Sequence, residues 1–187
     1  MNNKGLGSAM AGSTMGTTGR ERHPSDFYAT PADITRSLLL SPWRPPLEET
    51  IWECACGTDA MADAQRQAGY QVIATDIDTG HDFMKQESLL APSIMTNPPF
   101  KHATEFIEKA YDLRADYLAL LLKMTFWSAA SRLDLFRRCQ PVAVLPLTWR
   151  MDATGQGAPT MDCAWYVWYP TTRPTATRFE PLVRPGK

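Results

Sequence analysis

The segment Ile51–Asp78, IWECACGTDAMADAQRQAGYQVIATDID, carries the pattern that decides the fold. It predicts a strand over Thr50–Cys56, a helix from Asp59 or Ala60 to Ala68, and a second strand over Gln71–Ile77. Gly57 allows a tight turn after the first strand, and Gly69 ends the helix. A strand, a helix and a strand joined by short turns form a parallel β-α-β unit.

The same alternation continues on both sides of this unit. The further predicted strands are Ser93–Thr96, Tyr117–Leu122, Val142–Leu147 and Cys163–Tyr169, and the further helices are Thr30–Leu40, His102–Leu113 and Ser128–Arg138. We expect Thr30 to cap the first helix and Leu133 and Phe136 to face the core from the last one. The fold class is therefore α/β, with a mostly parallel sheet covered by helices on both faces. The last two strands have no helix between them, which predicts an antiparallel pair at one edge.

The chain of 187 residues has the length of one domain. Residues 1–23, rich in Gly, Ser, Thr and Met, are expected to form a flexible arm, residues 24–170 the folded domain, and residues 171–187 a basic tail. The formal net charge of −1 excludes a uniformly basic nucleic-acid-binding coat but allows a local basic face. We find no apolar run of membrane-spanning length and no signal peptide, so we expect a cytoplasmic protein with reduced cysteines and no membrane partner.

Ligands of such sheets bind at the carboxyl ends of the strands, and four short motifs lie at the ends of the predicted strands. In the first, Glu53–Gly57, the glycine lets the backbone approach a ligand, although a plain strand-to-helix turn has the same pattern. A single glycine is no dinucleotide fingerprint and favours a cofactor without pyrophosphate. Asp76 can accept both hydroxyls of a ribose, and Asp82 with Phe83 can hold an adenine ring. Either acid is equally compatible with a turn cap.

The fourth motif, Thr96-Asn97-Pro98-Pro99-Phe100, is the specific one. Two prolines hold the chain extended, so the Asn97 side-chain oxygen and the Pro98 carbonyl can point at one spot. Two converging acceptors suit an exocyclic amine with two N–H groups. Phe100 adds a flat face on which a ring can stack.

At these residues the sequence resembles the S-adenosylmethionine-dependent DNA adenine-N6 methyltransferases. The Asn-Pro-Pro-aromatic tetrad of that family matches Asn97–Phe100, its N-terminal cofactor motif matches Asp26–Pro31, and its glycine motif matches Glu53–Gly57. The ending Cys163–Trp168 and the short length are similar to the compact enzymes of phages and prophages. The resemblance implies a Rossmann-like methyltransferase fold over residues 24–170, S-adenosylmethionine as cofactor, double-stranded DNA as partner, and a role in evading restriction-modification.

Functional residues follow from the resemblance motif by motif. The implied catalytic residues are Asn97, Pro98, Pro99 and Phe100, and the implied cofactor-binding residues are Tyr28, Thr30, Pro31, Glu53, Ala55, Cys56, Gly57, Asp76, Ile77, Asp82, Phe83 and Asn97. Two positions depart from the family. Asp59 stands where a second glycine is usual, and its side chain is expected to narrow the pocket or weaken cofactor binding. Cys54 stands where proline is common.

The implied reaction needs neither a metal nor a covalent nucleophile. Asn97 and the Pro98 carbonyl would accept the two amine hydrogens of a flipped adenine, while Phe100 stacks on its ring. Candidate phosphate contacts are Lys101, His102, Arg150 and the cations of the tail, Arg173, Arg178, Arg184 and Lys187. All of these equally suit a solvated surface.

Other readings stay open beside this one. The same tetrad serves methylation of cytosine N4, of RNA bases and of protein glutamine side chains, and a fold with a damaged glycine motif can persist as a non-catalytic nucleic-acid-binding or anti-restriction protein. The four cysteines lack the paired spacing of a zinc site, so we expect no metal. Trp127, Trp165 and Trp168 are expected in the core, although Trp165 can also be placed near a flipped base.

Overall fold

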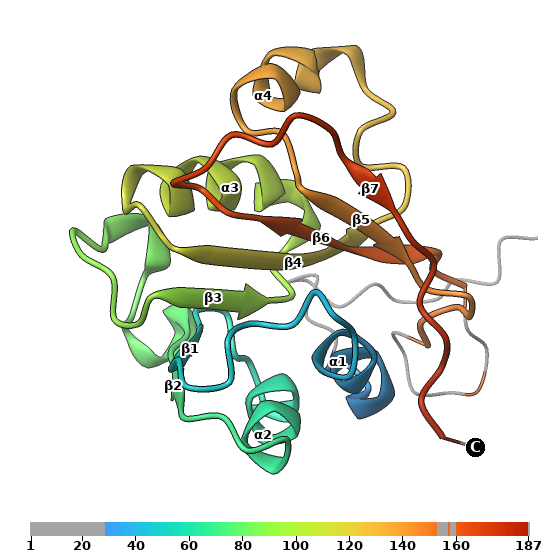
Figure 1. Ribbon diagram of the computed structural model, residues 1–187. Coiled ribbons are helices and arrows are strands. Elements are labelled where there is room, and N and C mark those ends of the chain that lie inside the picture. The colour runs from blue at the N-terminus through green and yellow to red at the C-terminus, as the bar shows by residue number, and fades with distance from the viewer. Residues whose placement is uncertain (1–28, 153–156, 158–159, 187) are drawn as a thin grey trace, which may run out of the picture.

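A computed structural model describes residues 29–152, 157 and 160–186, and contains one seven-stranded sheet with the order β2-β1-β3-β4-β6-β5-β7 (Figure 1). The strands are β1 (Ile51–Glu53), β2 (Val72–Ala74), β3 (Ser93–Thr96), β4 (Tyr117–Lys123), β5 (Ala143–Pro146), β6 (Cys163–Trp168) and β7 (Arg178–Phe179). The helices are α1 (Ala32–Leu39), α2 (Ala60–Gln67), α3 (Ala103–Asp112) and α4 (Leu133–Arg138). Four single 3-10 turns are η1 (Ile77–Thr79), η2 (Phe83–Lys85), η3 (Phe100–His102) and η4 (Ala130–Arg132).

The strand directions confirm the predicted fold class. Strands β2, β1, β3 and β4 are parallel neighbours, and β6 runs antiparallel to both β4 and β5. The antiparallel pair of β5 and β6 is as predicted, but β6 inserts between β4 and β5, and the edge belongs to β7, which pairs in parallel with β5. The short β7 was not predicted, because its two residues are both exposed and form no alternation of apolar and polar residues that would indicate a strand.

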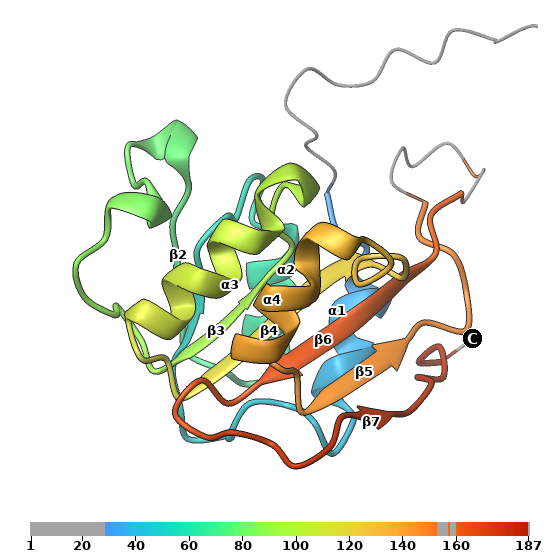
Figure 2. The same ribbon diagram turned by 90° about the horizontal axis from the view of Figure 1, so that it is seen from above.

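Helices α3 and α4 cover one face of the sheet, and α1 and α2 cover the other (Figures 1 and 2). Strand β4 supplies both resulting core layers. Its Leu118 and Leu120 pack with α3 and α4, whereas Ala119 and Leu121 pack with α1 and α2. The apolar run of this strand is continuous because both of its faces are buried.

Two expectations about the helices are wrong. The segment predicted as the last helix begins with the 3-10 turn η4, which changes the side of the helix that faces the core. Leu133 is therefore half-exposed, and Leu135 is buried instead. Phe136 is half-buried and contacts the edge of Trp127. The N-cap of α1 is Pro31, whose side chain has no hydrogen-bonding group, and the Thr30 hydroxyl accepts from the Asn97 amide instead of capping the helix.

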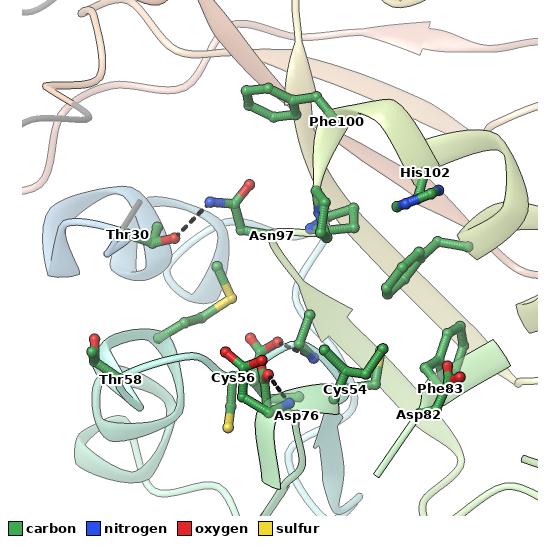
Figure 3. Close-up of a pocket in the computed structure, with 18 of the residues that line it drawn as sticks. Thr30, Cys54, Cys56, Thr58, Asp76, Asp82, Phe83, Asn97, Phe100 and His102 are labelled. Carbon is green, nitrogen blue, oxygen red and sulfur yellow. Dashed lines mark hydrogen bonds between the residues drawn. The ribbon is translucent and has the colours of Figure 1, made fainter. Parts of the chain in front are cut away.

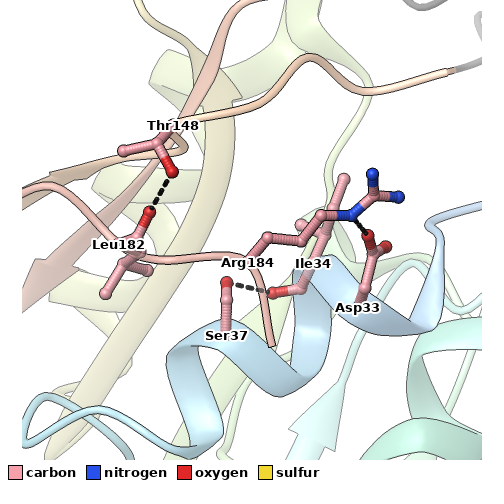
Figure 4. Close-up of polar contacts among 6 residues, drawn as sticks. All are labelled: Asp33, Ile34, Ser37, Thr148, Leu182 and Arg184. Atoms are coloured by element: carbon pink, nitrogen blue, oxygen red, sulfur yellow. Dashed lines mark hydrogen bonds and ion pairs between the residues drawn. The ribbon is translucent and has the colours of Figure 1, made fainter. Parts of the chain in front are cut away.

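The described part of the basic C-terminal segment packs on the domain. Two residues beyond β7 contact the domain. The Leu182 carbonyl accepts from the Thr148 hydroxyl at 2.9 Å, and Arg184 forms an ion pair with Asp33 of α1 at 2.6 Å (Figure 4). Arg184, one of the predicted phosphate contacts, is thus paired within the chain. Trp165 is fully buried, and its indole N–H donates to the Ile34 carbonyl, so it belongs to the core as first expected. The expected flexible arm, residues 1–23, lies outside the described residues.

Candidate active site

A cavity of about 400 Å³ opens at the carboxyl ends of β1, β2 and β3 (Figure 3). This volume lies in the range of small-molecule sites, and the place is the one where parallel sheets bind ligands. Most of the predicted site residues meet here. Those that line it are Thr30, Glu53, Ala55, Cys56, Asp76, Ile77, Asp82, Phe83, Asn97, Pro98, Pro99 and Phe100. Pro31 and Gly57 do not line it, and Tyr28 lies outside the described residues.

The backbone of the glycine motif is linked to the end of β2 beside the cavity. The Gly57 N–H donates to Asp76 Oδ2 at 2.9 Å, which ties the end of β1 to the end of β2. Gly57 has a φ of 52° and Asp59 a φ of 63°, both left-handed. The second glycine of the family therefore meets a backbone requirement, and here Asp59 adopts that conformation at some energetic cost. Asp59 does not line the cavity, so the structure does not support the expectation that its side chain narrows the pocket.

Asp76 has a structural task in addition to its predicted one. Its two oxygens accept the backbone N–H groups of Gly57 and Asp78, each at 2.9 Å. A carboxylate has about four acceptor positions, so two remain for a ligand at the cavity wall. Asp82 caps η2 by accepting the Met84 N–H, and the neighbouring Phe83 is buried against Phe106 and Trp52, with ring centroids 4.9 and 5.1 Å away.

Glu53 is the least expected feature of the cavity wall. It is 1% exposed, and its Oε1 accepts hydrogen bonds from the Thr96 hydroxyl and from the Ala55 N–H. Its Oε2 is buried and has no hydrogen-bond partner among the described residues. Burial raises the pKa of this carboxyl to about 8. A buried acceptor without a donor, in the wall of a cavity, fits a ligand that brings a cationic N–H group.

Asn97 offers a second free acceptor. Its amide nitrogen donates to Thr30 Oγ1 at 3.0 Å, while its buried Oδ1 has no partner within the described residues (Figure 3). The Thr30 hydroxyl thereby fixes the orientation of the Asn97 amide. Phe100, which begins η3, stands at the opposite end of the cavity from Asp76 and Asp82 (Figure 3).

Several further lining residues are absent from the predicted catalytic and cofactor-binding set. They are Ala29, Cys54, Thr58, Ala60, Met61, Asp78, Met84, Lys101, His102 and Phe106. Lys101 and His102 were predicted as phosphate contacts, and Ala29 and Cys54 lie inside predicted motifs. Thr58 and Met84 each directly follow a predicted motif, so extending the motifs by one residue finds them, whereas Ala60, Met61 and Phe106 come from the first turns of α2 and α3. In the described part of the chain no three His, Cys, Asp or Glu side chains gather as metal ligands, and the four thiols are free. None of the described helices has the length and apolar character that crossing a membrane requires.

Comparison with known proteins gives similarity in structure only. No family model and no curated protein matches the sequence. Among solved structures, a candidate RNA methyltransferase from Pyrococcus horikoshii superposes with a TM-score of 0.55 at 16% identity, covering 78% of this chain and 87% of that one. A candidate class I S-adenosylmethionine-dependent methyltransferase from Listeria monocytogenes gives 0.55 at 14% identity, covering 82% and 65%. The fold is that of the class I methyltransferases.

A third solved structure with this fold is a subunit of a candidate restriction enzyme. It is a modification subunit of a candidate type I restriction enzyme from Vibrio vulnificus YJ016, with a TM-score of 0.54 and 10% identity. The superposition covers 83% of this chain and 47% of the subunit, so the chain spans about half the length of that protein. At these identities the likeness establishes the fold, and the chemistry has to be argued from the residues of the cavity.

Proposed function

We propose that this chain transfers a methyl group from S-adenosylmethionine to the N6 amine of adenine in DNA. The observation that carries the proposal is the Asn97 carbonyl, a buried acceptor without a partner among the described residues, in an Asn-Pro-Pro-Phe tetrad at the carboxyl end of β3. An adenine amine is a weak nucleophile, because its lone pair is delocalised into the ring. An acceptor that binds its N–H groups concentrates electron density on the nitrogen.

The residues of the cavity fit the cofactor. Glu53 Oε2 would accept from the cofactor's ammonium group, and the open acceptor positions of Asp76 would take the ribose hydroxyls. Ile77 and Phe83 supply apolar surface for an adenine ring. When bound, S-adenosylmethionine supplies a methyl group on a sulfonium, already activated for transfer. The protein contributes orientation and a fixed set of acceptors.

Substrate selection is part of the same proposal. Phe100 would stack on a base flipped out of the duplex, and Asn97 with the Pro98 carbonyl would bind its amine. DNA is favoured by the resemblance to DNA adenine methyltransferases, and the Vibrio vulnificus subunit with this fold belongs to a restriction enzyme. RNA is the second candidate, because the Pyrococcus horikoshii protein is described as an RNA methyltransferase. A phage origin and protection from restriction remain parts of the DNA proposal.

Product analysis tests the reaction and its substrate together. Purified protein is incubated with isotope-labelled S-adenosylmethionine and either unmethylated duplex DNA or RNA, and the digested nucleosides are identified by mass spectrometry. We expect labelled N6-methyldeoxyadenosine from the wild type and, at the same incubation time, at least about a hundredfold less from Asn97→Ala. Label in a ribonucleoside would show that RNA is the substrate, and label in N4-methyldeoxycytidine would show that cytosine is the target base; either result would overturn the proposed substrate. Cofactor binding without label in any nucleoside would contradict nucleic-acid methylation.

A further inference from the structure

A second cavity, of about 370 Å³, adjoins the first at Phe100 and Lys101, which line both. It lies between the start of α3, the end of β4 and η4. Its other lining residues are Ala103, Leu122, Lys123, Thr125, Phe126 and Arg132. Phe100 thus stands between two hollows, at the end of the first cavity farthest from Asp76 (Figure 3).

The charge of this second cavity is opposite to that of the first. Three of its lining residues are cations, Lys101, Lys123 and Arg132, and no described lining residue is acidic. Lys101 and Lys123 are exposed and form no ion pair within the described residues. Two lysines left without counter-charges beside a fixed arginine make a site for an anion.

Two of the cations are held in place by aromatic rings. The Lys123 ammonium lies 5.2 Å from the centre of the Phe100 ring, and the Arg132 guanidinium lies 4.4 Å from the centre of the Phe126 ring. Arg132 also donates to the Phe126 carbonyl, which uses one of its five N–H groups and leaves the others for a ligand. One cation of the second cavity therefore lies at the ring that would stack on the target base, and another is fixed at Phe126.

We infer that the second cavity binds the phosphodiester of the nucleic-acid strand that carries the target base, through Lys101, Lys123 and Arg132. The inference rests on the proposed function, because it takes the base to stack on Phe100. In a nucleotide the base and the phosphate extend from one sugar, so a base held beside Asn97 directs its backbone past Phe100. Arg132 would donate two N–H groups to phosphate oxygens, and the lysines would add point charges.

The test compares two double variants that remove the same charge. Lys123→Gln/Arg132→Gln changes residues that line only the second cavity, whereas Lys109→Gln/Arg137→Gln changes residues of α3 and α4 that line neither cavity. Affinity for a fluorescent adenine-containing oligonucleotide, duplex or single-stranded, is measured by anisotropy at several salt concentrations. Binding of S-adenosylmethionine is measured by calorimetry, and thermal melting confirms that each variant is folded.

We expect the Lys123→Gln/Arg132→Gln protein to bind the oligonucleotide at least about tenfold more weakly, and its log–log salt slope to fall by about two. Cofactor affinity should stay within about twofold of the wild type, since neither residue lines the first cavity. Equal losses in both double variants would show a general charge effect and overturn the inference. If Lys123→Gln/Arg132→Gln destabilises the fold, Lys123→Gln alone is compared with Lys109→Gln by the same criteria.

The outcomes separate this inference from the proposed function. Wild-type methylation of DNA with unchanged affinity in Lys123→Gln/Arg132→Gln would refute the phosphate site and leave the activity intact. Wild-type protein that binds S-adenosylmethionine but no oligonucleotide would refute both the phosphate site and a nucleic-acid substrate. Loss of oligonucleotide affinity in that variant, with cofactor binding retained, supports the phosphate site even when the methylated base differs from adenine.

Discussion

The two cavities on either side of Phe100 are similar in volume and opposite in charge. The first, about 400 Å³, is lined by four carboxyl side chains, those of Glu53, Asp76, Asp78 and Asp82, and shares the cation Lys101 with the second. The second, about 370 Å³, is lined by three cations and, within the described residues, by no acid. An acid-lined cavity favours a ligand with positive charge, and a basic one favours an anion.

This difference assigns the two partners of the proposed reaction to separate places. S-adenosylmethionine carries a sulfonium and an ammonium group, whereas a nucleic-acid strand carries a negative charge at each phosphate. Phe100 lines both cavities and Asn97 lines the first, so the methyl group and its acceptor would have to meet beside these two residues. Four further predictions test this division, from the largest expected effect to the smallest.

The largest effect is expected from two variants that separate methyl transfer from cofactor binding. Asn97→Ala should lower the single-turnover rate by about 10²- to 10³-fold, because it removes an acceptor for the reacting amine. Asp76→Asn should instead weaken S-adenosylmethionine binding by about tenfold or more, since it removes a charged acceptor. Rapid-quench kinetics and calorimetry measure the two quantities. Equal losses of cofactor affinity in both variants would contradict the division of roles.

The second prediction concerns the pH dependence of stability in the acidic cavity. Glu53 ionises near pH 4.5 in the unfolded chain and near pH 8 in the folded protein, so the folded state holds one more proton between these values. The stabilising contribution of the protonated carboxyl is full below pH 4.5 and is lost as the pH rises through 8. From pH 5.5 to 7.5 the unfolding free energy of the wild type should fall by about 2 kcal/mol more than that of Glu53→Gln.

Urea unfolding of both proteins without cofactor measures this difference. The glutamine variant is the matched control, because it keeps the shape of the side chain and cannot ionise. Parallel curves for the two proteins would show that Glu53 does not titrate in this range. Cofactor affinity should also increase from pH 6 to 8 in the wild type alone, because the ionised carboxylate is the form that attracts an ammonium group.

The third prediction tests how Asn97 is oriented in the first cavity. Thr30→Val removes the hydroxyl that accepts a hydrogen bond from the Asn97 side-chain N–H group, and Thr30→Ser keeps this hydroxyl. One neutral hydrogen bond is worth about 1 kcal/mol, so the valine variant should methylate about five- to tenfold more slowly at saturating cofactor. The serine variant should stay close to the wild-type rate. A loss of the same size in both would assign the effect to packing instead of orientation.

The smallest effect is expected at Asp59, beside the acidic cavity but not in its lining. Asp59→Gly relieves a left-handed conformation in a residue with a Cβ, and should stabilise the fold by up to about 1 kcal/mol. Cofactor affinity should change less than twofold, because the side chain does not line the cavity. Thermal melting and calorimetry check both statements. A large gain in cofactor affinity would restore the view that Asp59 damages the glycine motif.

Much of the fold was readable from local pattern. The apolar run at Tyr117–Leu122 is a fully buried strand because it is covered on both faces, and Ser93–Thr96 ends where Pro98 and Pro99 follow. A connection without a helix predicted the antiparallel pair at one edge, but neither the edge strand β7 nor the insertion of β6 between β4 and β5 was predicted. Whether β6 lies at an edge or between β4 and β5 depends on pairing partners, which no local pattern encodes.

The site, like the fold, has features that the sequence predicted and features that it did not. The tetrad and the acidic motifs could be located, because the carboxyl ends of parallel strands share one edge. The sequence by itself determined these motifs, since turns and strand ends follow from residues that are neighbours in the chain. Only the tertiary structure decided that Thr30 binds Asn97, that one Glu53 oxygen lacks a donor, and that Lys101, Lys123 and Arg132 surround one hollow. Each of these depends on which distant segments the sheet order and helix packing bring together.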